Sequence, residues 1–194
     1  MNKTKKKYKL KKNRSKKRQN KLKGGSGQKF TKDKLNYIME KIVTLLHTYQ
    51  LTNWFIGYGT LLGVVRDNSC IDNDDDIDIV LDKNDKDKLH ELINENKFKF
   101  QYNKPNFCKI LLEENMPTVD FYLADVVDGN FNDTWEKLLW KDVLPINKYY
   151  WNNALIFMPN NYKSKLTTLY LDIHKKFKRG EYKTVHQRKI KLIE

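Results

Sequence analysis

The sequence predicts an α+β domain in which helices flank a mixed β-sheet, with a basic tail in front of it. Three observations support this fold class. The chain of 194 residues is 39% hydrophobic, which suits one domain with a single core. Apolar residues recur every three or four positions in some segments and alternate with polar residues in others. These helical and strand patterns follow one another without an internal repeat.

Residues 1–29 differ in composition from the rest of the chain. They hold 12 Lys and 2 Arg with no acidic residue, and they close in the linker Gly24-Gly25-Ser26-Gly27. Like-charge repulsion and scarce apolar side chains predict a disordered tail. Since the net charge of the whole chain is +14, residues 30–194 are predicted to form a domain without net charge. A domain that coats nucleic acid is therefore not favoured.

The tail itself allows several roles that the sequence does not separate. It is a solubilising segment, a nuclear-import signal, or an electrostatic anchor on nucleic acid or an anionic membrane. Cys70 and Cys108 read as free thiols of a reducing compartment, and no apolar secretory signal opens the chain. We expect an intracellular, cytoplasmic protein. Residues 42–65 lack charge, but His47 and Gln50 interrupt them, so no transmembrane segment is predicted.

The first helix is predicted from Thr31, a plausible N-cap, to about residue 49. Its apolar residues recur at helical spacing: Leu35, Ile38, Met39, Ile42, Leu45, Leu46 and Tyr49. Trp54 to Ile56 is a short apolar run that enters a glycine-rich turn at residues 57–60. Leu61 to Arg66 then starts a short helix. Ile77, Ile79 and Leu81 alternate with polar and smaller residues, which predicts a strand.

The second half alternates strands and helices. Residues 85–96 read as a helix, and residues 98–102, 107–112 and 118–127 read as three strands. A short helix is predicted around Trp135, Leu138 and Leu139, followed by a strand over residues 153–158. A last amphipathic helix is predicted from Tyr162, Leu166, Leu169, Tyr170, Ile173 and Phe177.

The acidic run before the predicted strand carries the chemistry. Five carboxylates fall within seven residues, at Asp72, Asp74, Asp75, Asp76 and Asp78. Asp76 and Asp78 lie inside the alternating strand, so both project from one face, ~6.6 Å apart along the chain. Two adjacent carboxylates repel each other, and a cation between them relieves that cost. A calcium loop is not favoured, because Ile77 and Lys83 stand where glycine and glutamate are needed.

A third carboxylate, Asp120, interrupts the apolar run from Thr118 to Leu123. If this strand lies beside the acidic strand, Asp120 joins Asp76 and Asp78 in one cluster. Three oxygen ligands on rigid strands suit Mg²⁺ or Mn²⁺ and leave open positions for phosphate oxygens. The amides of Gly59 and Thr60, at a helix start, and the guanidinium of Arg66 are expected to contact that phosphate.

At these residues the sequence resembles the LicD family, which includes the fukutin-type proteins, within the nucleotidyltransferase superfamily. The family pattern is matched by Gly59-Thr60-Leu61-Leu62-Gly63, by Arg66, by the run from Asp74 to Asp78, and by Val119-Asp120-Phe121. The resemblance implies a nucleotidyltransferase-like mixed sheet over residues 30–194. It also implies that Asp76, Asp78 and Asp120 are metal ligands. These three residues and Arg66 are the predicted catalytic residues, and Gly59, Thr60, Gly63 and Arg66 are predicted to bind substrate.

The resemblance further implies an activity. Family members transfer a phospho-alcohol, such as phosphocholine or ribitol phosphate, from a CDP-activated donor to a glycan or another hydroxyl acceptor. A second reading keeps the fold but transfers a nucleotide from an NTP to a small molecule, RNA or protein. A third reading is a non-catalytic binding protein anchored by its basic tail, which the complete carboxylate set argues against.

Overall fold

The structure is a computed structural model that describes residues 28–170 and 172–174. The predicted disorder of the tail concerns residues that lie almost wholly outside this range. The central sheet has the strand order β1-β2-β5-β4-β3. Its strands are β1 (Trp54–Ile56), β2 (Asp76–Asp82), β5 (Thr118–Val127), β4 (Phe107–Leu111) and β3 (Lys99–Lys104). Strands β2 and β5 run parallel and the other neighbouring pairs run antiparallel, which confirms the predicted mixed sheet.

Two further pairings extend this architecture. The end of β5 pairs with β6 (Asn130–Asp133), and β6 pairs with β7 (Leu138–Trp140), which makes a seven-stranded sheet. Strands β8 (Asn147–Trp151) and β9 (Ala154–Met158) form a separate antiparallel hairpin. This hairpin contacts α1 and β1, so it extends the core at the β1 edge of the sheet.

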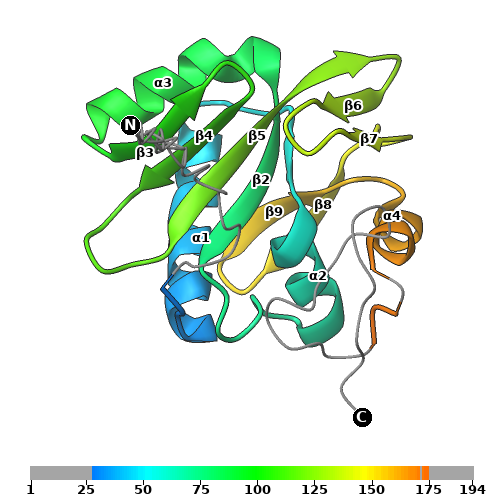
Figure 1. The fold of residues 1–194 in the computed structure, drawn as a ribbon, viewed down its shortest axis with the longest axis horizontal. Coiled ribbons are helices and arrows are strands. Elements are labelled where there is room, and N and C mark those ends of the chain that lie inside the picture. Colours follow the sequence, from blue (N-terminus) through cyan, green and yellow to red (C-terminus); the bar gives the residue numbers. More distant parts are fainter. Residues whose placement is uncertain (1–27, 171, 175–194) are drawn as a thin grey trace, which may run out of the picture.

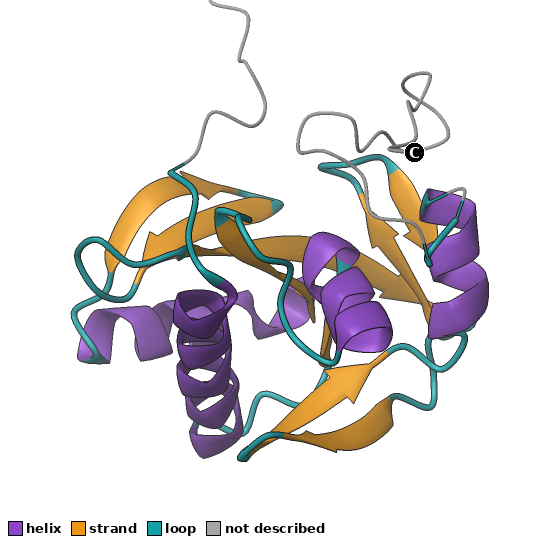
Figure 2. Ribbon diagram, turned by 90° about the horizontal axis from the view of Figure 1, so that it is seen from below, coloured by secondary structure: helices purple, strands orange, loops and turns teal. Residues whose placement is uncertain are grey.

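The helices are α1 (Lys32–Thr48), α2 (Tyr58–Asp67), α3 (Lys86–Glu95) and α4 (Tyr162–Leu169), with a short 3₁₀ turn over Lys83–Asp85. Figures 1 and 2 show α1 and α3 on one side of the sheet, whereas α2 lies beside β2 and next to α4. Within the described ranges, no helix has both the length and the apolar content needed to cross a bilayer.

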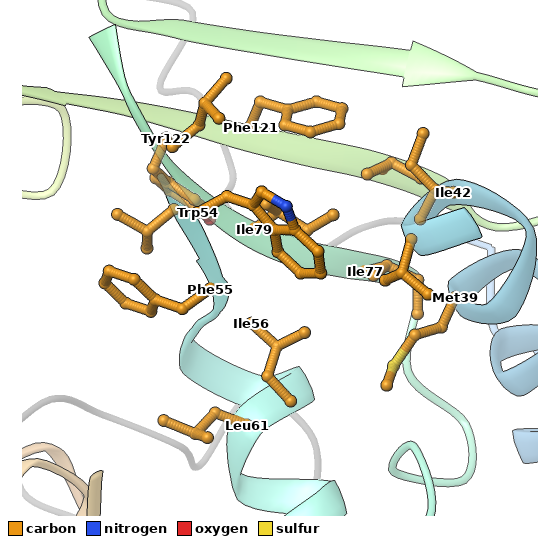
Figure 3. Close-up of a cluster of buried hydrophobic side chains, with 14 of the residues drawn as sticks. Met39, Ile42, Trp54, Phe55, Ile56, Leu61, Ile77, Ile79, Phe121 and Tyr122 are labelled. Carbon is orange, nitrogen blue, oxygen red and sulfur yellow. The ribbon is translucent and has the colours of Figure 1, made fainter. Parts of the chain in front are cut away.

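The core lies between α1 and the sheet, and the predicted alternation of β2 explains it. Ile77 and Ile79 are fully buried, and Ile77 points toward Met39 and Ile42 of α1 (Figure 3). Trp54 from β1 and Phe121 from β5 complete this layer. Since side chains alternate along a strand, Asp76 and Asp78 project from the opposite side of the sheet. Burial of the apolar face of β2 therefore determines where the carboxylates point.

The start of α1 is tied to the acidic loop. Thr31 occupies the predicted N-cap position, but its side chain makes no capping bond. Instead, the N–H of Lys32 donates to Asp72 Oδ1 at 3.1 Å. The backbone of Phe30 exchanges hydrogen bonds with Asn73 and Asp74. The acidic loop thus caps the helix, and the segment before α1 braces the loop.

One predicted helix is wrong. The residues around Trp135, Leu138 and Leu139 form a turn followed by strand β7. The cause is Asp133, whose Oδ1 accepts the N–H groups of Trp135 and Glu136 and so stabilises a turn. Strands of three and four residues, such as β6 and β7, are too short to show a reliable alternation.

The C-terminal part differs from prediction in two further ways. Strand β8 was not predicted, although the predicted strand over residues 153–158 is confirmed as its hairpin partner β9. The last helix ends at Leu169 because Tyr170 takes extended dihedral angles and buries its ring. Ile173, predicted to be helical, therefore lies beyond α4, and Phe177 is outside the described residues.

Candidate active site

The site begins where β1 gives way to α2. The predicted glycine-rich turn is the first turn of this helix, which starts at Tyr58. Tyr58 has a φ of 43°, which is unusual for a large side chain. Its hydroxyl donates to Asp133 at 2.5 Å, and its ring packs on Tyr122 and Trp140. These contacts hold the strained residue directly before Gly59.

Both carboxylate oxygens of Asp78 accept hydrogen bonds from the protein. Its Oδ2 accepts the N–H of Gly59 at 3.0 Å and that of Thr60 at 3.4 Å. Its Oδ1 accepts the hydroxyl of Tyr122 at 3.2 Å, and its own N–H donates to Thr60 Oγ1. The two amides predicted to contact phosphate therefore point at Asp78 in this structure. Thr60 additionally fixes the backbone of β2.

The sheet arranges four polar side chains in one row. Asp78 on β2 pairs with Asp120 on β5, which pairs with Lys109 on β4. Lys109 in turn pairs with Tyr102 on β3. Paired residues project from the same face, about 4.8 Å apart between neighbouring strands. The sequence-based expectation that Asp120 lies beside the acidic strand is confirmed, and Lys109 joins the carboxylates.

Lys109 was not among the predicted site residues. Its Nζ lies 3.2 Å from Asp76 Oδ2 and 3.0 Å from Asp120 Oδ2, so one ammonium group bridges two of the predicted metal ligands. The available signal was the same one that revealed Asp120, because Lys109 is a single charge within the otherwise apolar run of β4. Tyr122 was missed too, and its position within an apolar strand gave no comparable signal.

Burial and mutual repulsion strain the carboxylates. Burial raises the pKa of Asp78 well above its ordinary value, and Asp76 and Asp120 raise it further. Burial and Asp76 also raise the pKa of Asp120, against the opposing effect of Lys109. For Lys109, burial lowers the pKa, but Asp120 and Asp76 outweigh it and hold the ammonium charged. The single positive charge of Lys109 therefore does not balance the three carboxylates of the site.

The donor set fits a divalent cation such as Mg²⁺ or Mn²⁺. Asp120 Oδ1 is buried and has no hydrogen-bond partner, while Oδ2 of the same carboxylate binds Lys109. Carboxylate oxygens on rigid strands are the ligands that these hard cations prefer. Asp76 also belongs to a neighbouring group, in which one oxygen each of Asp74, Asp75 and Asp76 lie within 4.8 Å of one another.

Two predicted substrate residues lie elsewhere on α2. The Arg66 guanidinium donates to the carboxylate of Asp67, and its side chain is 6% exposed. At a rise of 1.5 Å per residue it sits about 10 Å along the helix from Gly59. Gly63 is buried, and a Cβ there would lie 2.6 Å from the carbonyl oxygen of Ser69. Gly63 therefore allows close packing of α2 on the loop before the acidic run.

An aromatic cluster borders the row of polar residues. Tyr122 packs on Phe107, which stacks on Trp135 with ring centroids 4.6 Å apart. Tyr102 contacts both Phe107 and Trp135. Trp135 and Tyr102 are each 37% exposed, so the cluster runs from the buried hydroxyl at Asp78 to the surface.

The class of protein follows from these features and from a family model. The mixed sheet, with carboxylates on adjacent parallel strands beside a helix start, is that of a nucleotidyltransferase domain. The family model described as LicD/FKTN/FKRP, nucleotidyltransferase domain, matches residues 52–165. This is more than half of the chain, and the matched range contains Gly59, Asp78, Lys109 and Asp120. The chain belongs to the LicD family, which confirms the predicted resemblance.

Two solved structures of one protein, ANT(2")-Ia, are similar to part of this chain. The crystal structure of ANT(2")-Ia in complex with adenylyl-2"-tobramycin is 15% identical, with a TM-score of 0.43, and covers 50% of this chain and 54% of its own. A solution structure of ANT(2")-Ia gives 15% identity and a TM-score of 0.45, with 54% of each chain covered. The present chain thus spans about half the length of ANT(2")-Ia.

A third solved structure covers more of both chains. The lincosamide antibiotic adenylyltransferase LnuA, bound to lincomycin, is 18% identical with a TM-score of 0.48. It covers 74% of this chain and 89% of its own. A search of the curated proteins found no match.

Proposed function

We propose that this domain is a divalent-metal-dependent transferase that moves a phospho-alcohol from a CDP-activated donor to a hydroxyl acceptor. Phosphocholine and ribitol phosphate are examples of the transferred group, and a glycan is the expected acceptor. The observation that carries the proposal is the direct pairing of Asp78 with Asp120, whose Oδ1 is buried without a partner. Membership of the LicD family supports the choice of donor.

In the proposed reaction an acceptor hydroxyl oxygen attacks the phosphorus that bears the alcohol. A new P–O bond forms, the bond to the bridging pyrophosphate oxygen breaks, and CMP leaves while the acceptor loses its proton. Asp76, Asp78 and Asp120 would hold the cation, which when bound offsets charge on the phosphate oxygens. Positioning and charge stabilisation account for most of the rate gain in phosphoryl transfer.

The other roles in the proposed reaction belong to residues of the chain itself. Asp76 and Lys109 are the most exposed groups of the cluster, with side chains 19% and 27% exposed, whereas Asp120 is 7% exposed. Substrate phosphate would therefore approach from the side of Asp76 and Lys109. The amides of Gly59 and Thr60 hold Asp78 in place, and one of the three carboxylates would accept the proton of the acceptor.

The deciding experiment measures CMP release from CDP-choline, CDP-ribitol and CDP-glycerol with and without Mg²⁺. The full chain is compared with the Asp78→Asn variant, and we expect release only from the wild type with metal. If none of the donors releases CMP but label passes from an NTP to an acceptor, the nucleotide-transfer reading replaces this one. That reading follows from the same fold and metal ligands.

Deleting the basic tail distinguishes a catalytic protein from a binding protein that the tail anchors. We propose that residues 1–29 locate the protein on nucleic acid or an anionic membrane without taking part in transfer. Deleting them should leave CMP release unchanged and abolish salt-sensitive retention on heparin or anionic vesicles. If all activity is lost while the domain stays folded, the protein is a binding module and the transferase proposal fails.

A further inference from the structure

Lys109 occupies the position between two of the carboxylates that a metal site would be expected to use. Its Nζ lies 3.2 Å from Asp76 Oδ2 and 3.0 Å from Asp120 Oδ2. Each of these distances is that of a charge-assisted hydrogen bond or ion pair. The two carboxylate oxygens are therefore at most about 6 Å apart, with an ammonium group between them.

The sheet keeps Lys109 in this position. Lys109 is the cross-strand neighbour of Asp120, and Tyr102 is its neighbour on the other side. Asp120 is almost completely buried, so moving the ammonium away would leave a buried carboxylate without its partner. Breaking a buried ion pair by removing one partner is strongly unfavourable. Lys109 is therefore a fixed part of the cluster.

The two oxygens of the Asp120 carboxylate differ in their surroundings. Oδ2 binds the ammonium of Lys109, and Oδ1 is buried with no hydrogen-bond partner. Asp78 has its oxygens oriented by neutral donors. Its Oδ2 accepts two amide N–H groups, whereas its Oδ1 accepts only the Tyr122 hydroxyl and keeps a lone pair for a cation. One divalent ion therefore has ligands on the Asp78 side of Asp120. A second ion on the Lys109 side would have to displace the ammonium.

Charge counting agrees with this division. Asp76, Asp78 and Asp120 together carry three negative charges when ionised, and Lys109 offsets one of them. A single divalent ion balances the remainder of these three ligands, while Asp74 and Asp75 belong to the neighbouring acidic group that includes Asp76. In two-metal sites the ions lie about 3.5–4 Å apart and share carboxylates. A second ion at that spacing would face the fixed ammonium of Lys109 at close range.

We propose that Lys109 is a built-in second cation, so that this site binds one divalent ion where a two-metal centre would bind two. This inference rests on the proposed function, because it concerns the same carboxylates. Lys109 is a positioning residue here: it orients Asp76 and Asp120 and supplies fixed positive charge that does not depend on the metal concentration.

The test counts Mn²⁺ ions on the full chain by EPR. Bound ions are counted from the loss of the free Mn²⁺ signal, and a pair of ions within one site is recognised by its magnetic coupling. The Asp120→Asn variant is measured in parallel, so that ions held elsewhere, including those at Asp74 and Asp75, are subtracted. Lys109→Met removes the ammonium and keeps the length of the side chain. Lys109→Arg retains a charge.

The matched control is Lys104→Met, which removes a lysine from the neighbouring strand β3. We expect one Asp120-dependent, uncoupled ion in the wild type, Lys104→Met and Lys109→Arg. Lys109→Met should bind two ions with a coupled signal. A coupled pair in the wild type, or a single ion in folded Lys109→Met, would overturn the inference and leave the transferase proposal standing.

The wild-type count can overturn the inference even if Lys109→Met fails to fold, because a coupled pair in the wild type contradicts it. If the wild type binds no Asp120-dependent ion, the inference fails together with the metal dependence of the proposed function. That outcome differs from a coupled pair, so the two failures are distinguishable.

Discussion

Asp78 and Asp120 lie directly opposite each other on the parallel strands β2 and β5, and both carboxylates are almost fully buried. Burial raises the pKa of each, and each carboxylate also contributes to the network that raises the pKa of Tyr122. Such an arrangement costs folding free energy unless a cation compensates for it. The position of this buried carboxylate pair beside the first turn of α2 points to function, since stability alone would favour apolar residues.

Replacing Asp78 by Asn should separate function from stability. We expect transfer activity to fall on the order of 10²- to 10³-fold. Without metal, the free energy of unfolding should rise by on the order of 1 kcal/mol, because a buried and repelled carboxylate is neutralised. Urea denaturation with and without Mg²⁺ measures this.

Asp125→Asn is the matched control for Asp78→Asn. It changes a half-exposed carboxylate of β5 that pairs with Lys83 at the surface. Its effect should stay within about 1 kcal/mol, with activity retained. A metal-free Asp78→Asn protein that is less stable than wild type would show that Asp78 serves mainly to hold α2.

Gly63→Ala and Gly59→Ala should have different effects, although both glycines belong to the family motif. A Cβ at Gly63 would meet the backbone of Ser69 and Ile71 at 2.6 and 2.9 Å. We expect a loss of about 1–3 kcal/mol in unfolding free energy, because backbone cannot easily move aside. A Cβ at Gly59 would meet only carboxylate oxygens of Asp74 and Asp78, at 3.1 and 3.3 Å.

Gly59→Ala should therefore change stability less and weaken Mn²⁺ binding more than Gly63→Ala. Thermal melting and Mn²⁺ titration of the two variants provide the comparison. A Gly63→Ala protein that melts like the wild type but loses activity would favour the prediction that Gly63 contacts substrate.

Tyr58→Phe tests the support beneath the site. The hydroxyl of Tyr58 donates to Asp133, a carboxylate with no exposed surface. Its removal should cost about 1–3 kcal/mol, because a buried acceptor loses its donor. The comparison is Tyr49→Phe, whose hydroxyl bonds the exposed Glu95 and should change stability by less than about 0.5 kcal/mol. Equal effects in urea denaturation would mean that the Tyr58 bond has no special structural role.

Lys165 provides a pH-dependent test away from the metal site. It is 9% exposed, donates to the carbonyl of Leu139 and lies over the ring of Trp140. Burial lowers its pKa, and Lys141 lowers it further. The folded state then releases the proton more readily than the unfolded state. The resulting penalty is fully present below the folded pKa and disappears as the pH rises through the unfolded value of about 10.4.

Lys165→Met should therefore be more stable than wild type near pH 7, and the difference should shrink toward pH 10.5. Guanidinium denaturation across this range measures the difference. Lys163→Met, on the exposed side of the same helix, should show no such trend. A difference that grows with pH would contradict the sign derived from burial.

The spacing of apolar residues correctly predicted the helices and strands that bury one apolar face. The apolar spacing of α1 and the alternation of β2 gave the correct elements, since each buries one apolar face. Strands β6 and β7 were missed because pairing between distant residues and the turn at Asp133 stabilise them, with little pattern of their own. Strand β8 is exposed over most of its length and likewise lacked an apolar signal.

The sequence by itself determined the acidic strand, its buried face and the membership of Asp76 and Asp78 in one polar face. Only the tertiary structure decided that β5 lies parallel to β2 in a register that pairs Asp78 with Asp120, and that β4 brings Lys109 between Asp76 and Asp120. The reason is physical. Alternation is a property of one strand, whereas strand order and register depend on contacts between different strands, such as that of Asp78 with Asp120, 42 positions apart.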